Sequence, residues 1–132
     1  NASPASIRAA ISVLSHTPPE GAGRRIAVLG DMLELGERSA PLHAGLARHL
    51  EQAKIDLVFT GGNEMKLLRD ALPAEMRGGH AASAAALAPM VKAALKPGDV
   101  ITVKGSYGSR MRDVVAALKD MNIAPPQAVN GN

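Results

Sequence analysis

Hydrophobic residues recur along this chain with two spacings, one typical of helices and one typical of buried strands. The first stripe at helical spacing consists of Ile7, Ala10, Ile11 and Leu14. Ser3 followed by Pro4 is a helix start, with Ser3 as the N-cap, and the pattern ends before Pro18. A helix is therefore expected between Pro4 and Pro18, followed by a loop at residues 21–23.

Short runs of aliphatic residues then alternate with further helical stripes. The runs predict strands over residues 25–29, 55–60, 80–82 and 100–103. The stripes predict helices over residues 41–53, from an Asn63 cap through Leu72, within residues 83–95, and from Met111 to Leu118. Pro89 lies inside one of these stripes and removes a backbone hydrogen bond, so that helix is expected either to start late or to kink.

Strands separated by helices indicate a parallel sheet, because a crossover helix returns the chain to the end of the sheet where the previous strand began. The expected fold class is α/β, a three-layer, Rossmann-like, mostly parallel sheet with helices on both faces. In such folds the loops that follow the strands carry the ligand sites. The chemistry is therefore expected at the turns over residues 30–37 and 104–110.

Composition excludes several classes of protein. The chain has 132 residues, 46% of them hydrophobic, which suits one domain, and only Phe59 and Tyr107 are aromatic, which argues against base stacking. The net charge of +3 is spread along the chain, so no nucleic-acid partner is expected. The absence of cysteine excludes disulfides and thiolate chemistry and fits a cytoplasmic location. No apolar run approaches the roughly 20 residues of a membrane span, so no membrane contact is expected either.

The two ends of the sequence suggest a piece of something longer. The chain begins at Asn1 without an initiator methionine, and its first helix signal follows at once. We expect a single monomeric domain over residues 1–132, with a core at 1–120 and a frayed tail at 121–132, cut from a larger protein.

Residues 104–110 join a buried strand to a helix, and two glycines there let backbone N–H groups turn outward. An anion could bind at this turn, with Lys104 and Arg110 supplying charge; a plain tight turn with solvated cations explains the pattern equally well. The run is not a Walker A loop, and residues 21–23 are not a dinucleotide fingerprint.

Carboxylates at Asp31, Glu34 and Glu37 follow the strand at 25–29 and could hold a magnesium ion or receive an amine. A solvated acidic loop that caps the next helix is the simpler interpretation. The histidines lack the spacing of a zinc helix, so no metal site is expected, and His43 beside an apolar stripe is interpreted as a packed structural residue.

Taken together and in order, several motifs resemble the carboxy-terminal domain of the Mur ligases. They are Asn-Ala-Ser-Pro-Ala-Ser at residues 1–6, Gly-Asp-Met and Glu-Leu-Gly within residues 30–36, His43, and Pro-Gly-Asp leading to Lys-Gly-Ser within residues 97–106. The resemblance runs from residue 1 to about residue 120. It is greatest to the member that adds D-alanyl-D-alanine to UDP-N-acetylmuramoyl-tripeptide.

The resemblance implies a three-domain, ATP-dependent ligase of peptidoglycan synthesis. An amino-terminal domain would hold the UDP sugar, a central domain would supply the P-loop and bind ATP and Mg²⁺, and this domain would close over both. ATP phosphorylates the terminal carboxylate of the peptide, and the amine of D-alanyl-D-alanine attacks the acyl phosphate. Without the P-loop, the isolated domain is expected to be inactive.

Site roles follow the motifs of the resemblance. Asn1 and Ser3 would approach the adenine and ribose of ATP. Lys104, Ser106 and Arg110 would face the incoming dipeptide, with Lys104 stabilising charge.

Asp31 would lie near the same cleft. Tyr107 departs from the arginine common in the family, and Arg112 stands where glutamate is frequent. Arg110 is therefore the preferred partner for the dipeptide carboxylate.

Two other functional classes stay open. One is a sister ligase, of the folate-polyglutamating or cyanophycin type, that accepts a different amine on the same fold; the spacing of Gly-Asp-Met and Glu-Leu-Gly favours the D-alanyl-D-alanine member. The other is a non-catalytic doubly wound binding module, against which the missing initiator methionine argues.

Overall fold

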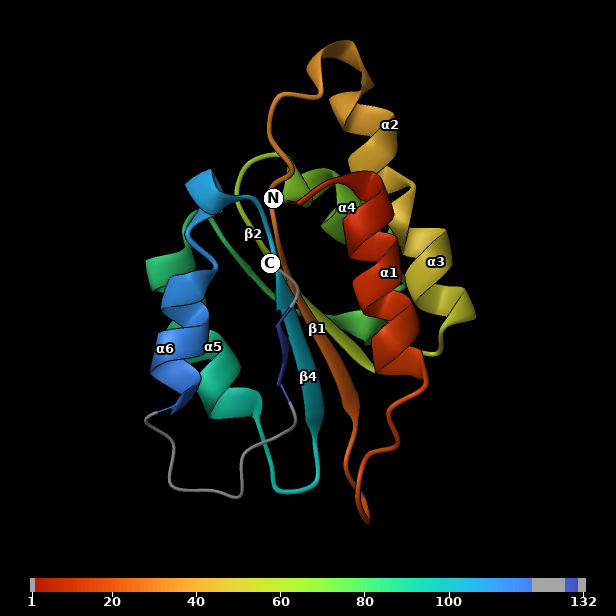
Figure 1. The fold of residues 1–132 in the computed structure, drawn as a ribbon, viewed down its shortest axis with the longest axis vertical. Coiled ribbons are helices and arrows are strands. Elements are labelled where there is room, and N and C mark those ends of the chain that lie inside the picture. Colours follow the sequence, from red (N-terminus) through yellow and green to blue (C-terminus); the bar gives the residue numbers. More distant parts are fainter. Residues whose placement is uncertain (1, 120–127, 131–132) are drawn as a thin grey trace.

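A parallel sheet of five strands forms the centre of the fold, in the order β3-β2-β1-β4-β5. The structure is a computed structural model that describes residues 2–119 and 128–130 (Figure 1). Its strands are β1 (Arg25–Gly30), β2 (Leu57–Gly61), β3 (Arg77–Ala81), β4 (Val100–Lys104) and β5 (Ala128–Asn130). Its α-helices are α1 (Pro4–Ser15), α2 (Ser39–Ala44), α3 (Leu46–Gln52), α4 (Met65–Ala71), α5 (Ala84–Ala94) and α6 (Arg112–Lys119).

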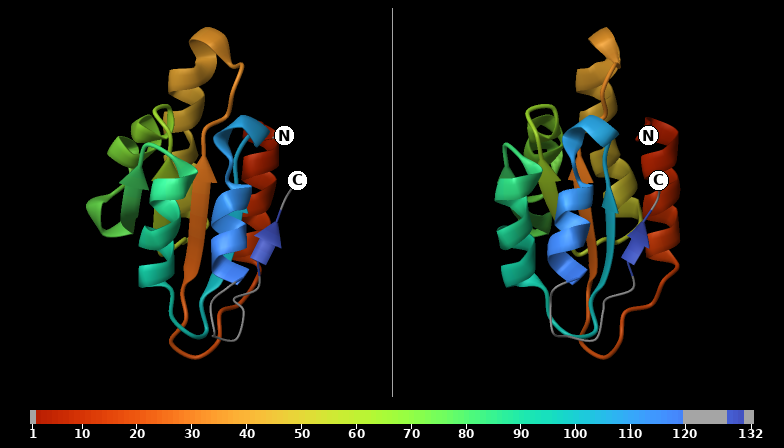
Figure 2. Two further views of the ribbon diagram at one scale, coloured as in Figure 1. Left: turned by 90° about the vertical axis from the view of Figure 1, so that its left-hand side faces the viewer. Right: turned by 60° about the vertical axis from the view of Figure 1, so that its left-hand side comes forward.

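Helices cover both faces of the sheet, which confirms the predicted three-layer α/β fold. One buried cluster joins the sheet to α1, α3 and α4, and a second joins it to α5 and α6 (Figures 1 and 2). Alternate residues of β1 belong to different clusters: Ala27 and Leu29 face the first group of helices, Ile26 and Val28 the second. This two-sided burial explains why the strand is a continuous apolar run and not an alternating one.

The order in which strands are added to the sheet reverses at β1. From β1 the chain runs through α2 and α3 to β2 on one side, whereas β4 lies on the other side of β1. The loops that leave β1 and β4 therefore diverge to opposite faces. Such a switch point is where open α/β sheets form a crevice beyond the carboxyl ends of their strands.

Most predicted elements are confirmed, and the first helix begins as expected, with Ser3 as N-cap in a capping box with Ser6. The prediction of a single helix over residues 41–53 is wrong, because two helices cover this region. The helical region starts earlier, at Ser39, and is interrupted at Gly45 between α2 and α3. A Cβ at position 45 would lie 2.8 Å from the Pro41 carbonyl oxygen, so only glycine fits there without a shift.

Two strand starts also differ from the sequence predictions. The second strand begins at Leu57 instead of Ile55, and the third begins at Arg77 instead of His80. Helix α5 starts at Ala84 and continues through Pro89, so the helix does not start late. Proline has no N–H group to donate to the Ala85 carbonyl. Because Ala85 and Pro89 are exposed, water can bind that carbonyl instead.

The prediction of a frayed tail is wrong for residues 128–130, which pair with β4 as the fifth strand. The rest of the predicted tail, residues 121–127 and 131–132, lies outside the described residues.

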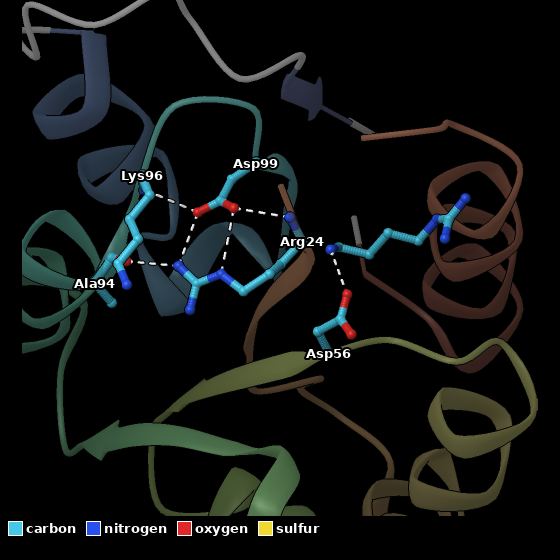
Figure 3. Close-up of polar contacts among 6 residues, drawn as sticks. Arg24, Asp56, Ala94, Lys96 and Asp99 are labelled. Atoms are coloured by element: carbon cyan, nitrogen blue, oxygen red, sulfur yellow. Dashed lines mark hydrogen bonds and ion pairs between the residues drawn. The ribbon is translucent and has the colours of Figure 1, made fainter. Parts of the chain in front are cut away.

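At the end of the sheet where the strands begin, called here the amino edge, an ion pair joins Arg24 to the buried Asp99 (Figure 3). Asp99 is 2% exposed and accepts hydrogen bonds from the Arg24 guanidinium and from the backbone N–H groups of Arg24 and Lys96, at 2.8–2.9 Å. The same guanidinium donates to the Ala94 carbonyl at 2.7 Å. These contacts join the loops that enter β1 and β4 at the end of the sheet opposite the candidate site.

Candidate functional site

A cleft of about 530 Å³ opens at the carboxyl edge of the sheet. The loops that follow β1, β2, β3 and β4 all contribute to it, together with the first turns of α5 and α6. Its lining residues are Asp31, Leu33, Gly61, Gly62, Asn63, Ala82, Ser83, Ala84, Ala85, Gly108, Ser109, Arg110 and Asp113. The volume is in the usual range of small-molecule sites, and the position matches the switch point of the chain.

Asp31 joins three elements at the floor of this cleft. Its carboxylate accepts a hydrogen bond at 2.9 Å from the Met65 N–H, at the start of α4, and its backbone oxygen accepts one at 3.1 Å from Ser106. Asn63 was expected to cap this helix, but the structure shows no side-chain cap from the helix's own segment. That expectation is wrong because a carboxylate from a distant strand end occupies the capping position.

The backbone next to Asp31 is held by His43. The imidazole is fully buried; its Nε2 accepts from the Met32 N–H at 3.0 Å, and its Nδ1 lies 2.8 Å from the Ser39 carbonyl oxygen. This pattern fits a neutral ring with its proton on Nδ1. The structure thus confirms His43 as a packed structural histidine, and it adds that the residue fixes the loop that carries Asp31 and Leu33.

Arg110 lies at the mouth of the cleft with a left-handed backbone, φ 59°. Its side chain is 64% exposed and forms an ion pair of 3.0 Å with Asp113 in the first turn of α6. A left-handed conformation is uncommon for residues other than glycine, asparagine and aspartate, so the fold constrains the backbone at Arg110. Arg110 and Asp31 therefore share the cleft, as the sequence predicted.

Lys104 and Ser106 do not line the cleft. Val100 faces the helices α1, α3 and α4, and Ile101 and Val103 face the opposite layer, so strand alternation places Lys104 on the α1 side. Lys104 is 3% exposed, and burial lowers its pKa. The Ser106 hydroxyl is buried and has no hydrogen-bond partner in the described part of the chain.

The other predicted site residues are placed as follows. Ser3 lies outside the cleft, and its hydroxyl accepts from the Ser6 N–H at 3.1 Å, so it serves as a helix cap. Asn1 lies outside the described residues. Glu34 and Glu37 are exposed and do not line the cleft, so the acidic cluster does not converge with Asp31. Within residues 2–119 and 128–130, no group of three or more potential ligands could hold a metal ion.

The amino end of α5 is a part of the site that the sequence analysis missed. Ser83, its N-cap, accepts from the Ala86 N–H at 3.2 Å, and Ser83, Ala84 and Ala85 line the cleft. The first backbone N–H groups of a helix favour negative charge. A serine between a strand and an alanine-rich stripe was visible in the sequence, and its position after a parallel strand was the available signal.

The cleft therefore offers groups of both signs. Asp31 and Asp113 supply carboxylates, while Arg110 and the amino end of α5 supply positive potential. A small molecule with a cationic group at one end and an anionic group at the other matches this arrangement. No helix of the described chain is long and apolar enough to cross a bilayer.

Comparison with known proteins gives consistent matches. Residues 1–107 match the family described as Mur ligase, glutamate ligase domain. Among curated proteins, the UDP-N-acetylmuramoyl-tripeptide--D-alanyl-D-alanine ligase of Bacillus subtilis (strain 168) is 34% identical over 121 residues, or 89% of this chain and 26% of that protein. The ligase of the same name from Escherichia coli (strain K12) is 35% identical, over 91% of this chain and 25% of that protein.

Solved structures agree with the sequence matches. The MurF ligase of Thermotoga maritima, crystallised in complex with ADP, is similar with a TM-score of 0.72 and 28% identity, over 89% of this chain and 26% of that one. The chain spans about a quarter of the length of the relatives it matches.

Proposed function

Because this chain belongs to the Mur ligase family, we propose that it is the carboxy-terminal domain of an ATP-dependent ligase that adds D-alanyl-D-alanine to UDP-N-acetylmuramoyl-tripeptide. This step belongs to the synthesis of peptidoglycan precursors. The names of the curated relatives support this activity, and their greater length supports a larger parent enzyme that carries the remaining domains.

The observation that carries the proposal is that the cleft at the switch point has both negatively and positively charged groups in its lining. D-alanyl-D-alanine has an ammonium group at one end and a carboxylate at the other, with two methyl side chains between them. In the proposal, Arg110 and the amino end of α5 receive the carboxylate, and Asp31 lies toward the ammonium group. A rigid cleft that fixes both ends would hold the nitrogen in one orientation for attack.

The proposed reaction forms one bond and breaks another at the acyl carbon. The peptide carboxylate is first activated as an acyl phosphate, with ATP as phosphoryl donor. The dipeptide ammonium group first loses one proton to solvent, and its nitrogen then bonds to the acyl carbon. The bond from that carbon to the phosphate oxygen breaks with the electron pair on phosphate, and the nitrogen loses its second proton to the departing phosphate. No protein nucleophile is needed, so this domain contributes positioning and charge stabilisation.

Lys104 and Ser106 are proposed to act from the α1 side of the end of β4, on an acyl phosphate that lies at this strand end within reach of the dipeptide nitrogen. A buried ammonium group close to developing negative charge stabilises it more than an exposed one would. The Ser106 hydroxyl is buried and has no hydrogen-bond partner among the described residues, which supports a ligand contact at this position, because buried polar groups are normally hydrogen-bonded.

ATP is proposed to bind mainly to the central domain of the parent enzyme, and the ADP in the Thermotoga maritima structure supports nucleotide use by the family. Asn1 and Ser3 remain proposed contacts to its adenine and ribose. Mg²⁺ is proposed to bind together with ATP in the central domain. A cytoplasmic location and a monomeric state complete the proposal.

The test is steady-state kinetics of the full-length enzyme with Arg110→Ala. Loss of a charge-assisted contact worth about 1.5–3 kcal/mol should raise KM for D-alanyl-D-alanine about tenfold or more, while KM for ATP stays the same. Arg48→Ala is the control, because Arg48 is exposed on α3 and outside the cleft. An unchanged KM for the dipeptide would remove Arg110 from the site, and a wild-type enzyme inert toward the dipeptide would refute the proposed function.

A further inference from the structure

Leu33 is the only large apolar side chain among the described residues that line the cleft. It follows Asp31 by two positions, and it is 47% exposed although most leucines of this chain belong to the core. Its neighbours in the lining are small or polar, including Gly61, Gly62, Ala84 and Ala85. Among the described lining residues, Leu33 therefore offers the largest apolar surface to an uncharged part of a ligand.

The structure holds Leu33 in place from two sides. On one side the preceding residue, Met32, is buried and its N–H donates to His43 Nε2 at 3.0 Å. On the other side Leu33 packs against the turn that follows β4, because a Cβ at Gly108 would lie 2.7 Å from Leu33 Cδ1. Leu33 thus spans from the β1 loop to the β4 loop, the two segments that diverge at the switch point.

This placement puts Leu33 near two charged residues of the cleft along the chain. Asp31 lies two residues before it in the same loop, and Arg110 lies two residues after its contact at Gly108. A ligand whose charged ends reach Asp31 and Arg110 would bring the segment between those ends to the Leu33 side chain. In a zwitterionic dipeptide that segment carries the side chains.

We propose that Leu33 determines specificity for the side chains of the incoming amine, by packing against a methyl group of the dipeptide; this rests on the proposed function. The small residues opposite leave room for a methyl-sized group, and the leucine supplies the apolar surface that such a group covers. An acceptor with the same charged ends but no methyl groups lacks this contact. Discrimination between the two acceptors is therefore the property that Leu33 controls.

The experiment compares D-alanyl-D-alanine with glycylglycine as acceptors of the full-length enzyme, in wild type and in Leu33→Ala. One methyl or methylene contact in an apolar pocket is worth about tenfold or more in kcat/KM. Leu33→Ala should lower kcat/KM for D-alanyl-D-alanine by about tenfold and leave that for glycylglycine within about twofold, so the preference collapses. KM for ATP should not change.

Matched variants separate this effect from a general loss of structure. Leu67→Ala removes a similarly exposed leucine, 37% on α4 and outside the cleft, and should leave the preference as in wild type. Leu33→Met keeps apolar contact and should retain most of the preference. Equal losses for both acceptors in Leu33→Ala, or no loss for either, would overturn the inference. The proposed function would still stand in both cases, since it depends on wild-type activity with D-alanyl-D-alanine.

Discussion

Single buried polar residues determine how the loops of this domain are fixed at both edges of the sheet. At the carboxyl edge, His43 accepts from Met32 and holds the loop beside Asp31. At the amino edge, Asp99 accepts four hydrogen bonds, three from Arg24 and one from Lys96 (Figure 3). Each residue satisfies backbone N–H groups that would otherwise be buried without partners, and an unsatisfied buried group of this kind costs about 1–3 kcal/mol.

Asp99 should make the stability of the domain sensitive to acid. Burial alone would raise the pKa of Asp99, but hydrogen bonds from the Arg24 side chain and from the backbone of Lys96 and Arg24 outweigh it, and the pKa is lowered. The pKa of Asp99 in the folded state therefore lies below the unfolded value of about 3.9. The charged Asp99 carboxylate stabilises the folded domain fully above pH about 3.9, and this contribution disappears as the pH falls through the folded pKa.

Urea unfolding of wild type and Asp99→Asn tests this expectation. At pH about 7 the variant should lose about 1–3 kcal/mol of unfolding free energy, a difference that should narrow as the pH falls below about 4. Asp70→Asn is the matched control, because the Asp70 carboxylate is 68% exposed and pairs with Arg69 at the surface. If the difference in unfolding free energy between wild type and Asp99→Asn stays constant with pH, the charge of Asp99 is not responsible for the loss of stability.

At the scale of elements, the sequence predicted correctly those helices and strands whose formation depends on neighbouring residues. The Ser3–Pro4 start of α1, the continuous apolar runs of β1 and β4, and the helical stripe of α5 all needed only neighbours in sequence. The cap of α4 could not be predicted in this way, because its acceptor is Asp31, which lies 34 residues earlier in the chain.

The candidate site was predictable only in part for the same reason. Asp31 and Arg110 follow strands, and the rule that strand ends meet at one edge placed them together. The separation of Lys104 from Arg110 depends on which face each residue of β4 takes, and residues 104–110 had been treated as one turn. The amino end of α5 was missed because its contribution comes from backbone N–H groups, and the available signal was the position of Ser83 directly after a predicted strand.

Asp31 joins elements and also lies in the cleft, and two substitutions can separate these roles. Asparagine retains an acceptor and is as good a helix cap as aspartate, whereas alanine removes the acceptor and should cost about 0.5–2 kcal/mol of stability. If the carboxylate also receives the ammonium group, Asp31→Asn should raise KM for D-alanyl-D-alanine in the full-length enzyme without changing the melting temperature. A variant with wild-type KM would restrict Asp31 to capping α4.

At the scale of the whole molecule, Arg110 and Lys104 lie on different sides of the end of β4. The cleft with Arg110 lies at the loops and helices α5 and α6, and Lys104 lies on the α1 side of β4. Binding of the dipeptide and stabilisation of the reacting group are therefore assigned to opposite sides of one strand end. Substitutions on the two sides should then affect different kinetic parameters.

Lys104→Met tests this division in the full-length enzyme. Loss of a buried charge that acts in the transition state should lower kcat about a hundredfold and leave KM for D-alanyl-D-alanine within about twofold. The methionine retains most of the side-chain volume, so folding should be preserved. Lys92→Met, on the exposed surface of α5, is the control. A normal kcat would remove Lys104 from the mechanism.

The most direct test of the proposed activity is product analysis with the full-length enzyme. The enzyme is incubated with ATP, UDP-N-acetylmuramoyl-tripeptide and an equimolar mixture of D-alanyl-D-alanine and L-glutamate, and the products are identified by mass spectrometry. We predict one product, the tripeptide joined to D-alanyl-D-alanine with loss of one water, and one ADP formed for each molecule of product. A product that contains glutamate, or ADP release without any amide product, would contradict the assignment of this domain to a D-alanyl-D-alanine-adding ligase.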